Sequence, residues 1–323
     1  MLTTGHTCRA AVVAALALYL SGPTPAAAAG PYPAPPALPP LTAETLGARY
    51  EATQRAVEDA LVVAESLGDR RRTAALRSLR GRRLLDVDAR GDGRAVEVLG
   101  DLADADRIAV LVPGSHTTLD TFSNRRGPGG AARALAEQVR RADPAARVAV
   151  VAWLGFEPPQ RLSHRVLTDH LARDGARRLR EAVAALRTVN PDAAVSLLCH
   201  SYGSVVCAHA APGLDVADLA VYGSPGVLVP DAGAFSGTRV WVGRADGDWI
   251  RFVPPVRVAG VGFGSDPMSP GFGGRVFAAG AGGHGDYHRP GGVALRNLSL
   301  IALGTGPGGS GGCGRAAPER CRG

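Results

Sequence analysis

The sequence predicts an α/β fold, in which a mostly parallel sheet is covered by helices on both faces. From about residue 107 onwards, short apolar runs alternate with longer segments of helical periodicity, the pattern of repeated strand–helix units. Before them, two apolar runs flank Gly91-Asp92-Gly93, which indicates an antiparallel hairpin. The polar residues that could act in catalysis also follow predicted strands. In a parallel sheet, ligands bind at the carboxyl ends of the strands.

Each element is predicted from its local pattern. Apolar residues at helical spacing, ended by Gly68, predict a helix over 43–67. The later elements are, in order, strands 84–89, 95–99 and 107–112, a helix at 130–142, a strand at 148–153, a helix at 167–189, a strand and a helix on either side of Ser201, strands 218–222, 240–242 and 275–279, and a helix at 293–303.

The two ends of the chain differ in composition from its middle. Residues 1–29 combine Arg9, a short apolar core and small residues, which predicts a secretory signal peptide and an extracellular protein. The apolar core is too short to span a bilayer, and an uncleaved membrane anchor is the alternative. A proline-rich linker at 30–42 and a glycine-rich tail at 305–323 then leave one folded domain at 43–304.

The charge is basic but has an unusual composition. The formal net charge is +7, and all 36 basic residues are arginine. No basic stripe interleaved with aromatic residues is present, so nucleic acid is not an expected partner. The absence of lysine excludes a Ser-Lys dyad, a Schiff-base lysine and a P-loop lysine.

The stretch around Ser201 carries the strongest chemical signal. An apolar run at 193–198 predicts a buried strand, and the small, apolar residues 204–210 predict a helix packed close behind it. A sharp turn between them would hold the Ser201 hydroxyl at a helix N-terminus, where backbone N–H groups stabilise an oxyanion. This is the pattern of a nucleophile elbow, G-x-S-x-G, with Cys199 in place of the first glycine. The alternative is an ordinary helix capped by a serine.

Five short motifs in order carry a family resemblance: Val112-Pro113-Gly114, Trp153-Leu154-Gly155, His200-Ser201-Tyr202-Gly203-Ser204, Asp248-Trp249-Ile250 and His284-Gly285-Asp286-Tyr287. Over about residues 75 to 304, the chain resembles the α/β-hydrolase superfamily, and most closely a group of poorly characterised bacterial members. The resemblance implies an eight-stranded sheet, with the nucleophile after the fifth strand, an acid after the seventh and a histidine after the eighth. Because the superfamily hosts many activities, it does not name the substrate.

The resemblance implies a Ser-His-Asp triad with Ser201 as nucleophile. Asp248 is the preferred acid because it matches the D-x-I pattern and precedes apolar residues that can hold its loop, with Asp246 as the alternative. Chain order leaves His284 and His288 as candidates for the base. We prefer His284, which follows a flexible glycine run and begins the H-G-x-Y match.

An oxyanion hole needs two N–H donors. The N–H of Tyr202 is expected to supply one, and the loop after the third strand the other. Since Pro113 has no N–H, Ser115 is the expected second donor. His116 in the same loop is a possible contact to substrate, although a loop histidine is more often simply solvated.

Two rival sites fit less well. Residues 280–285 match G-x-G-x-x-G, but Pro290 interrupts any helix there and no acidic residue follows at the required distance. His284 and His288 have the spacing of a helical metal-binding pair, but Gly285 and Pro290 argue against a helix. Neither a metal nor an organic cofactor is therefore expected.

The predicted protein is a secreted serine hydrolase, most simply a carboxylic-ester hydrolase. The alternatives are a non-catalytic secreted binding protein on the same scaffold, a serine peptidase or an acyltransferase. Residues 223–238, where many lipases insert a lid, are too few for a large one, so an open site for soluble or surface-presented esters is expected. We expect a monomer without stable membrane insertion after signal cleavage.

The cysteines of the exported chain are expected to differ in state. Cys313 and Cys321 close a short loop in the tail and are predicted to form a disulfide. Cys199 and Cys207 are predicted to stay as buried thiols, because a strand end and a helix interior rarely meet disulfide geometry.

Overall fold

The computed structural model describes residues 30–160, 170–257 and 262–308. The predicted signal peptide at 1–29 and the predicted Cys313–Cys321 disulfide lie outside the described residues. Within the described part, no helix is long and apolar enough to cross a membrane.

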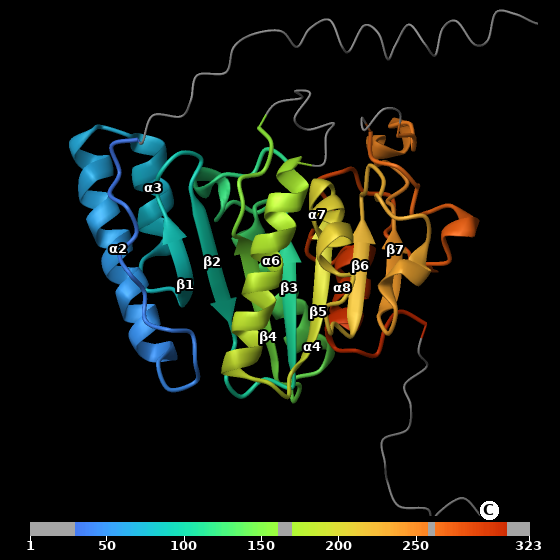
Figure 1. Ribbon diagram of the computed structural model, residues 1–323, viewed down its shortest axis with the longest axis horizontal. Helices are drawn as coiled ribbons and strands as arrows, with labels where there is room; N and C mark the ends of the chain where they lie inside the picture. The colour runs from blue at the N-terminus through green and yellow to red at the C-terminus, as the bar shows by residue number, and fades with distance from the viewer. Residues whose placement is uncertain (1–29, 161–169, 258–261, 309–323) are drawn as a thin grey trace, which may run out of the picture.

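One eight-stranded sheet forms the centre of the molecule, in the order β1-β2-β4-β3-β5-β6-β7-β8 (Figure 1). β2 pairs antiparallel with both β1 and β4, and all the other pairs are parallel. The strands are β1 (Leu84–Asp88), β2 (Arg94–Leu99), β3 (Arg107–Val112), β4 (Val148–Leu154), β5 (Ala194–His200), β6 (Asp218–Tyr222), β7 (Arg239–Gly243) and β8 (Arg275–Val276). The predicted α/β fold with an antiparallel start is confirmed.

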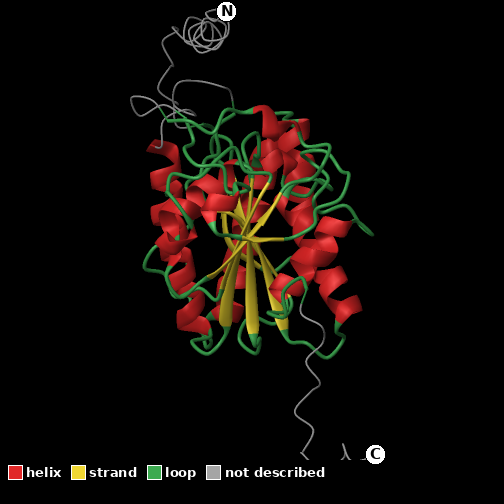
Figure 2. Ribbon diagram, turned by 90° about the vertical axis from the view of Figure 1, so that its right-hand side faces the viewer, coloured by secondary structure: helices red, strands yellow, loops and turns green. Residues whose placement is uncertain are grey.

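Helices cover both faces of this sheet (Figure 2). They are α2 (Leu46–Ser66), α3 (Arg70–Leu79), α4 (Pro128–Ala142), α6 (described from His170, His170–Val189), α7 (Tyr202–Ala210) and α8 (Val293–Ala302). The helices α6 and α7 pack in the core on one face, while α3, α4 and α8 pack in the core on the other. β5 lies between β3 and β6, and all but its end residues are buried, as expected for a parallel strand covered on both faces.

Two elements differ from the sequence prediction. The helix α3 was not expected, because its arginine-rich sequence has a weak apolar pattern; the Asp69 side chain caps it by accepting a hydrogen bond from Arg72 N–H, and Leu76 and Leu79 are fully buried. β8 is shorter than predicted, since Phe277 N–H makes one more bond to β7 and the chain then leaves the sheet.

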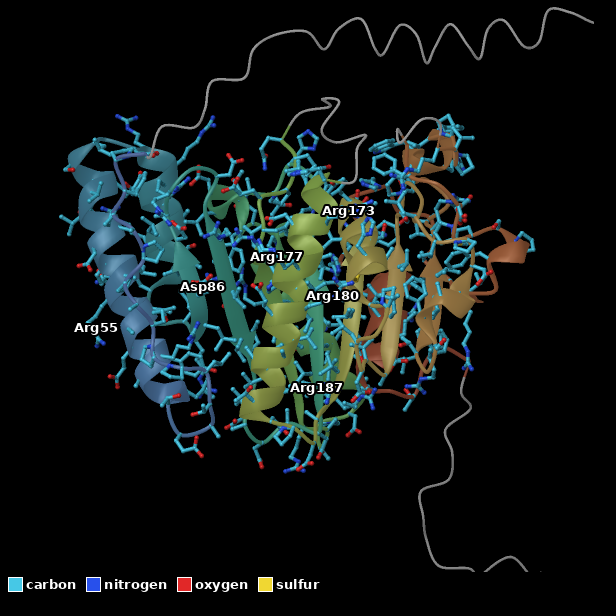
Figure 3. All side chains as sticks on the ribbon, viewed as in Figure 1. Arg55, Asp86, Arg173, Arg177, Arg180 and Arg187 are labelled. Carbon is cyan, nitrogen blue, oxygen red and sulfur yellow. A yellow bond between two sulfur atoms is a disulfide. The ribbon has the colours of Figure 1, made fainter. Side chains whose placement is uncertain are left out.

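Arginines of α6 form ion pairs with acidic side chains or hydrogen bonds to backbone carbonyls. Figure 3 shows Arg173, Arg177, Arg180 and Arg187 along this helix. Arg177 pairs with Asp174 and Glu181, one helical turn away on either side, and the Arg180 and Arg187 guanidinium groups donate to backbone carbonyls. The positive charges of Arg177, Arg180 and Arg187 on α6 are therefore paired with acidic side chains or bound to backbone carbonyl groups.

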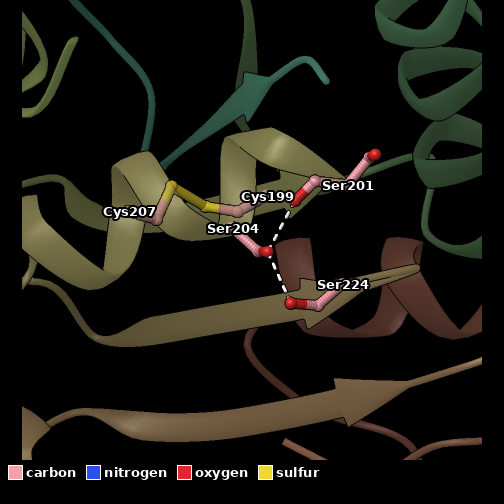
Figure 4. The surroundings of a disulfide bond; sticks show 5 residues. All are labelled: Cys199, Ser201, Ser204, Cys207 and Ser224. Carbon is pink, nitrogen blue, oxygen red and sulfur yellow. Dashed lines mark hydrogen bonds between the residues drawn. A yellow bond between two sulfur atoms is a disulfide. The ribbon is translucent and has the colours of Figure 1, made fainter. Parts of the chain in front are cut away.

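The prediction for Cys199 and Cys207 is wrong, because these residues form a disulfide between β5 and α7 (Figure 4). The chain reverses at Ser201, so that α7 runs back beside the strand. Two strand residues span roughly 6.6 Å and six helical residues roughly 9 Å, and the two cysteines come level with each other. Their Cα atoms lie 6.4 Å apart, within the usual disulfide range. The sharp turn at Ser201 was predicted from the sequence, but not that it brings Cys199 and Cys207 level with each other.

Peptide mapping without reductant should find Cys199 and Cys207 protected from alkylation under denaturing conditions, and alkylated after reduction. Because the bond closes a loop with a sequence separation of 8, we expect a variant with both cysteines changed to alanine to lose about 2 kcal/mol of unfolding free energy. Two alkylated thiols in the unreduced protein would contradict the assignment.

Candidate active site

Ser201 occupies a strained turn between β5 and α7. Its backbone has φ 52° and ψ −126°, a region that non-glycine residues adopt only when the surroundings impose it. The turn also requires a glycine two residues later. A Cβ atom on Gly203 would lie 2.6 Å from the carbonyl oxygens of both Val112 and Pro113, so only glycine lets α7 approach the end of β3 this closely.

Three residues from distant parts of the chain form one hydrogen-bonded series. His284 Nε2 lies 2.9 Å from Ser201 Oγ. On the other side of the ring, His284 Nδ1 lies 2.9 Å from Asp248 Oδ1 and 3.0 Å from Oδ2. The structure thus brings together the three residues predicted as nucleophile, base and acid, which follow β5, β8 and β7.

Asp248 is a fully buried carboxylate held by several donors. Oδ1 accepts from the Ile250 N–H at 2.8 Å, and Oδ2 accepts from the Tyr287 hydroxyl at 2.5 Å. Burial raises the pKa of Asp248, but the hydrogen bonds from His284, Tyr287 and the Ile250 N–H outweigh it and hold the pKa below its usual value. Asp248 is therefore charged at neutral pH, whereas Asp246, the alternative acid, is exposed.

Tyr287 is the last residue of the H-G-x-Y motif, and no role for it was predicted from the sequence. Its hydroxyl donates to Asp248 and accepts a hydrogen bond from the Ala245 N–H at 3.1 Å. Burial raises the pKa of this phenol further above its ordinary value, so it remains a donor. Tyr287 thereby joins the end of β7 to the acid and fixes the position of the carboxylate.

Two further histidines of the site, His200 and His288, bond to groups other than Ser201. His200 Nε2 lies 2.9 Å from the carbonyl oxygen of His284, to which it donates, and the two rings are 4.9 Å apart. His288 Nε2 lies 2.9 Å from the Tyr222 hydroxyl. Burial lowers the pKa of His200 well below its ordinary value and that of His288 to about 4, so both rings are neutral at pH 7.

The loop after β3 comes directly against the Ser201 side chain. A Cβ atom on Gly114 would lie 2.7 Å from Ser201 Cβ and 3.1 Å from Oγ. His116, with φ 60°, is exposed, and its N–H donates to the Pro159 carbonyl at 3.0 Å. His116 N–H is thus already bonded, and the N–H groups of Ser115 and Tyr202 remain the expected oxyanion donors.

A cavity of about 620 Å³ lies beside Ser201. Its walls come from the loop after β3, from the segment that leads into α4, and from Trp249 and His284. Trp249 is 56% exposed, and its ring packs 4.8 Å from that of His284. No described residue of segment 223–238 lines the cavity.

The geometry does not favour the rival sites. The glycine run at 280–285 leads into turns, and α8 begins only at Val293. The two ring nitrogens of His284 face Ser201 and Asp248. Among the described residues, no group of three or more histidine, cysteine or acidic side chains converges as metal ligands would.

Substitution of each candidate acid should separate their roles. We expect Asp248→Asn to lower kcat by at least about 10³-fold, because an amide cannot stabilise the imidazolium or select its tautomer. Asp246→Asn, a matched change two residues away, should leave kcat within about twofold. Steady-state ester hydrolysis by both folded variants measures this, and a larger loss from Asp246→Asn would reverse the assignment.

Comparison with known proteins identifies a family for this chain. A family model described as alpha/beta hydrolase matches residues 88–258. Two uncharacterised proteins of Mycobacterium tuberculosis are 33% identical over 248 residues, covering 67% of this chain and 38% of theirs. The chain therefore spans well under half the length of these relatives.

Two solved structures of low sequence identity also match the chain, at low TM-scores. An α/β serine hydrolase without lid from Xanthomonas campestris is 17% identical, with 65% of this chain and 88% of that one covered and a TM-score of 0.38. Esterase PE8 is 16% identical, with 64% and 97% covered and a TM-score of 0.43. By its match to the family model, the chain belongs to the α/β hydrolase family.

Proposed function

We propose that this protein is a secreted serine hydrolase that cleaves carboxylic esters through an acyl-enzyme. The observation that carries the proposal is the hydrogen-bonded series Ser201–His284–Asp248, in which a buried carboxylate orients a histidine toward a serine hydroxyl. This is the arrangement that activates a serine as a nucleophile.

In the first half of the reaction, Ser201 Oγ attacks the ester carbonyl and its proton passes to His284 Nε2. Asp248 stabilises the resulting imidazolium through Nδ1–H. The N–H groups of Tyr202 and Ser115 donate to the oxyanion of the tetrahedral intermediate. When the intermediate collapses, the alcohol leaves with the proton from His284, and the acyl group stays on Ser201.

In the second half, a water molecule gives a proton to His284 Nε2 and attacks the acyl carbonyl. The second intermediate breaks the bond to Ser201 Oγ, which recovers its proton, and the carboxylic acid departs. Every proton transfer passes through one nitrogen, so the reaction needs no metal or organic cofactor.

The surroundings of the triad support a small or surface-presented ester as substrate. The cavity beside Ser201 is of the size that holds small ligands. The composition of residues 1–29 supports export, and a disulfide between Cys199 and Cys207 is compatible with an oxidising compartment. Nucleic acid is not part of the proposal, and the protein would act as a monomer.

Ser201→Ala should abolish hydrolysis of p-nitrophenyl esters, with kcat lowered by up to about 10⁶-fold, because no other group replaces the nucleophile. Ser236→Ala, at an exposed serine, is the control and should keep wild-type rates. Circular dichroism and the melting temperature should show both variants folded. A folded Ser201→Ala protein with a tenth of wild-type activity would refute the proposal.

A further inference from the structure

The charged side chains that line the cavity beside Ser201 are of one sign. Among the described residues that line it, Arg126 is the only side chain with a permanent charge, and no aspartate or glutamate is present. The half-buried histidines His200 and His288 also line it, and desolvation lowers the pKa of both, which keeps them neutral at pH 7. A substrate in this cavity therefore meets one fixed positive charge and no described negative one.

Arg126 packs against the loop that carries His284. A Cβ atom on Gly285 would lie 3.0 Å from Arg126 Cδ and 3.1 Å from Nε, so the arginine packs over the backbone of this glycine. Gly285 follows His284, whose Nε2 is 2.9 Å from Ser201 Oγ. The guanidinium is thus held one residue away from the histidine that contacts the serine.

An ion pair anchors this arginine without using up its donors. Arg126 Nη2 donates to Asp286 Oδ1 at 3.0 Å, while Asp286 Oδ2 accepts from the Gly283 N–H at 3.1 Å. Asp286 does not line the cavity. A guanidinium has five N–H donors, and within the described residues the bond to Asp286 is the only one that Arg126 makes.

The segment next to Arg126 also favours a negatively charged ligand. Pro128, the first residue of the 15-residue helix α4, and Gly127, its N-cap, also line the cavity. The N-terminal end of a helix carries partial positive charge, which adds to the field of the guanidinium.

We propose that Arg126 binds an anionic group of the substrate, so that the preferred ester carries a carboxylate on its acyl or its alcohol part. The proposal rests on the proposed ester hydrolysis and names its substrate class. A carboxylate can accept two N–H bonds from one guanidinium, which fixes both the charge and the orientation of the ester relative to Ser201.

Two matched pairs of esters test the proposal and distinguish the two sides of the substrate. p-Nitrophenyl butyrate and mono-p-nitrophenyl succinate differ by a carboxylate on the acyl part; phenyl acetate and 4-carboxyphenyl acetate differ by one on the alcohol part. After subtraction of spontaneous hydrolysis, the wild type should show a kcat/KM about tenfold higher for the anionic member of at least one pair. That preference should weaken as salt is added.

Substitution then assigns the preference to Arg126. Arg126→Gln should raise KM for the anionic ester about tenfold and leave the neutral ester within twofold, whereas Arg126→Lys should keep part of the preference because it keeps the charge. Arg125→Gln is the matched control: it removes the same charge from the neighbouring exposed residue, which does not line the cavity.

The outcomes separate this proposal from the function on which it rests. If the wild type hydrolyses the neutral esters but prefers neither anionic ester, or if Arg125→Gln removes the preference as fully as Arg126→Gln, the role of Arg126 is wrong and ester hydrolysis stands. If the wild type hydrolyses none of the four esters and does not react with a fluorophosphonate, the proposed function itself fails.

Discussion

Ser201 holds a backbone conformation with φ 52° that would relax if its neighbours allowed it. Such a conformation costs on the order of 1–3 kcal/mol and persists only where the surrounding structure over-determines it. Its N–H donates to the Tyr222 carbonyl at 3.0 Å, and its own carbonyl accepts from the Ser204 hydroxyl at 2.6 Å. Figure 4 shows the Cys199–Cys207 bond joining the strand before this turn to the helix after it. These hydrogen bonds and the disulfide between β5 and α7 hold the turn in its strained conformation. The Ser201 hydroxyl is thereby kept in position at the end of the strand.

His284, the proposed base, lies on a loop that is rich in glycine. Ordering this loop costs conformational entropy. His200 and Tyr287 offset that cost from two sides: the former donates to the His284 carbonyl, and the latter joins the acid to the end of β7. Gly285 leaves room for Arg126 above the same loop. Through these contacts, the position of the proposed base depends on groups that themselves take no part in proton transfer.

The fold could be predicted from the sequence because the central parallel strands are short apolar runs. Glycines and segments of helical periodicity lie between these runs and mark where each one ends. The resemblance to the α/β hydrolases allowed Ser201, Asp248 and His284 to be grouped, and residues that follow parallel strands do meet at one edge. The Cys199–Cys207 bond required knowledge of how far the helix folds back beside its strand. The pairing of Arg126 with Asp286 joins residues 160 positions apart, and no local pattern reports such a contact.

The activation of Ser201 by His284 and Asp248 can be measured by treating the folded protein with a fluorophosphonate and locating the adduct by peptide mass spectrometry. We expect a single adduct on Ser201 that forms rapidly in the wild type and in His288→Ala, and is slowed by several orders of magnitude in His284→Ala. An adduct on another residue, or equal labelling rates in the wild type and His284→Ala, would contradict it.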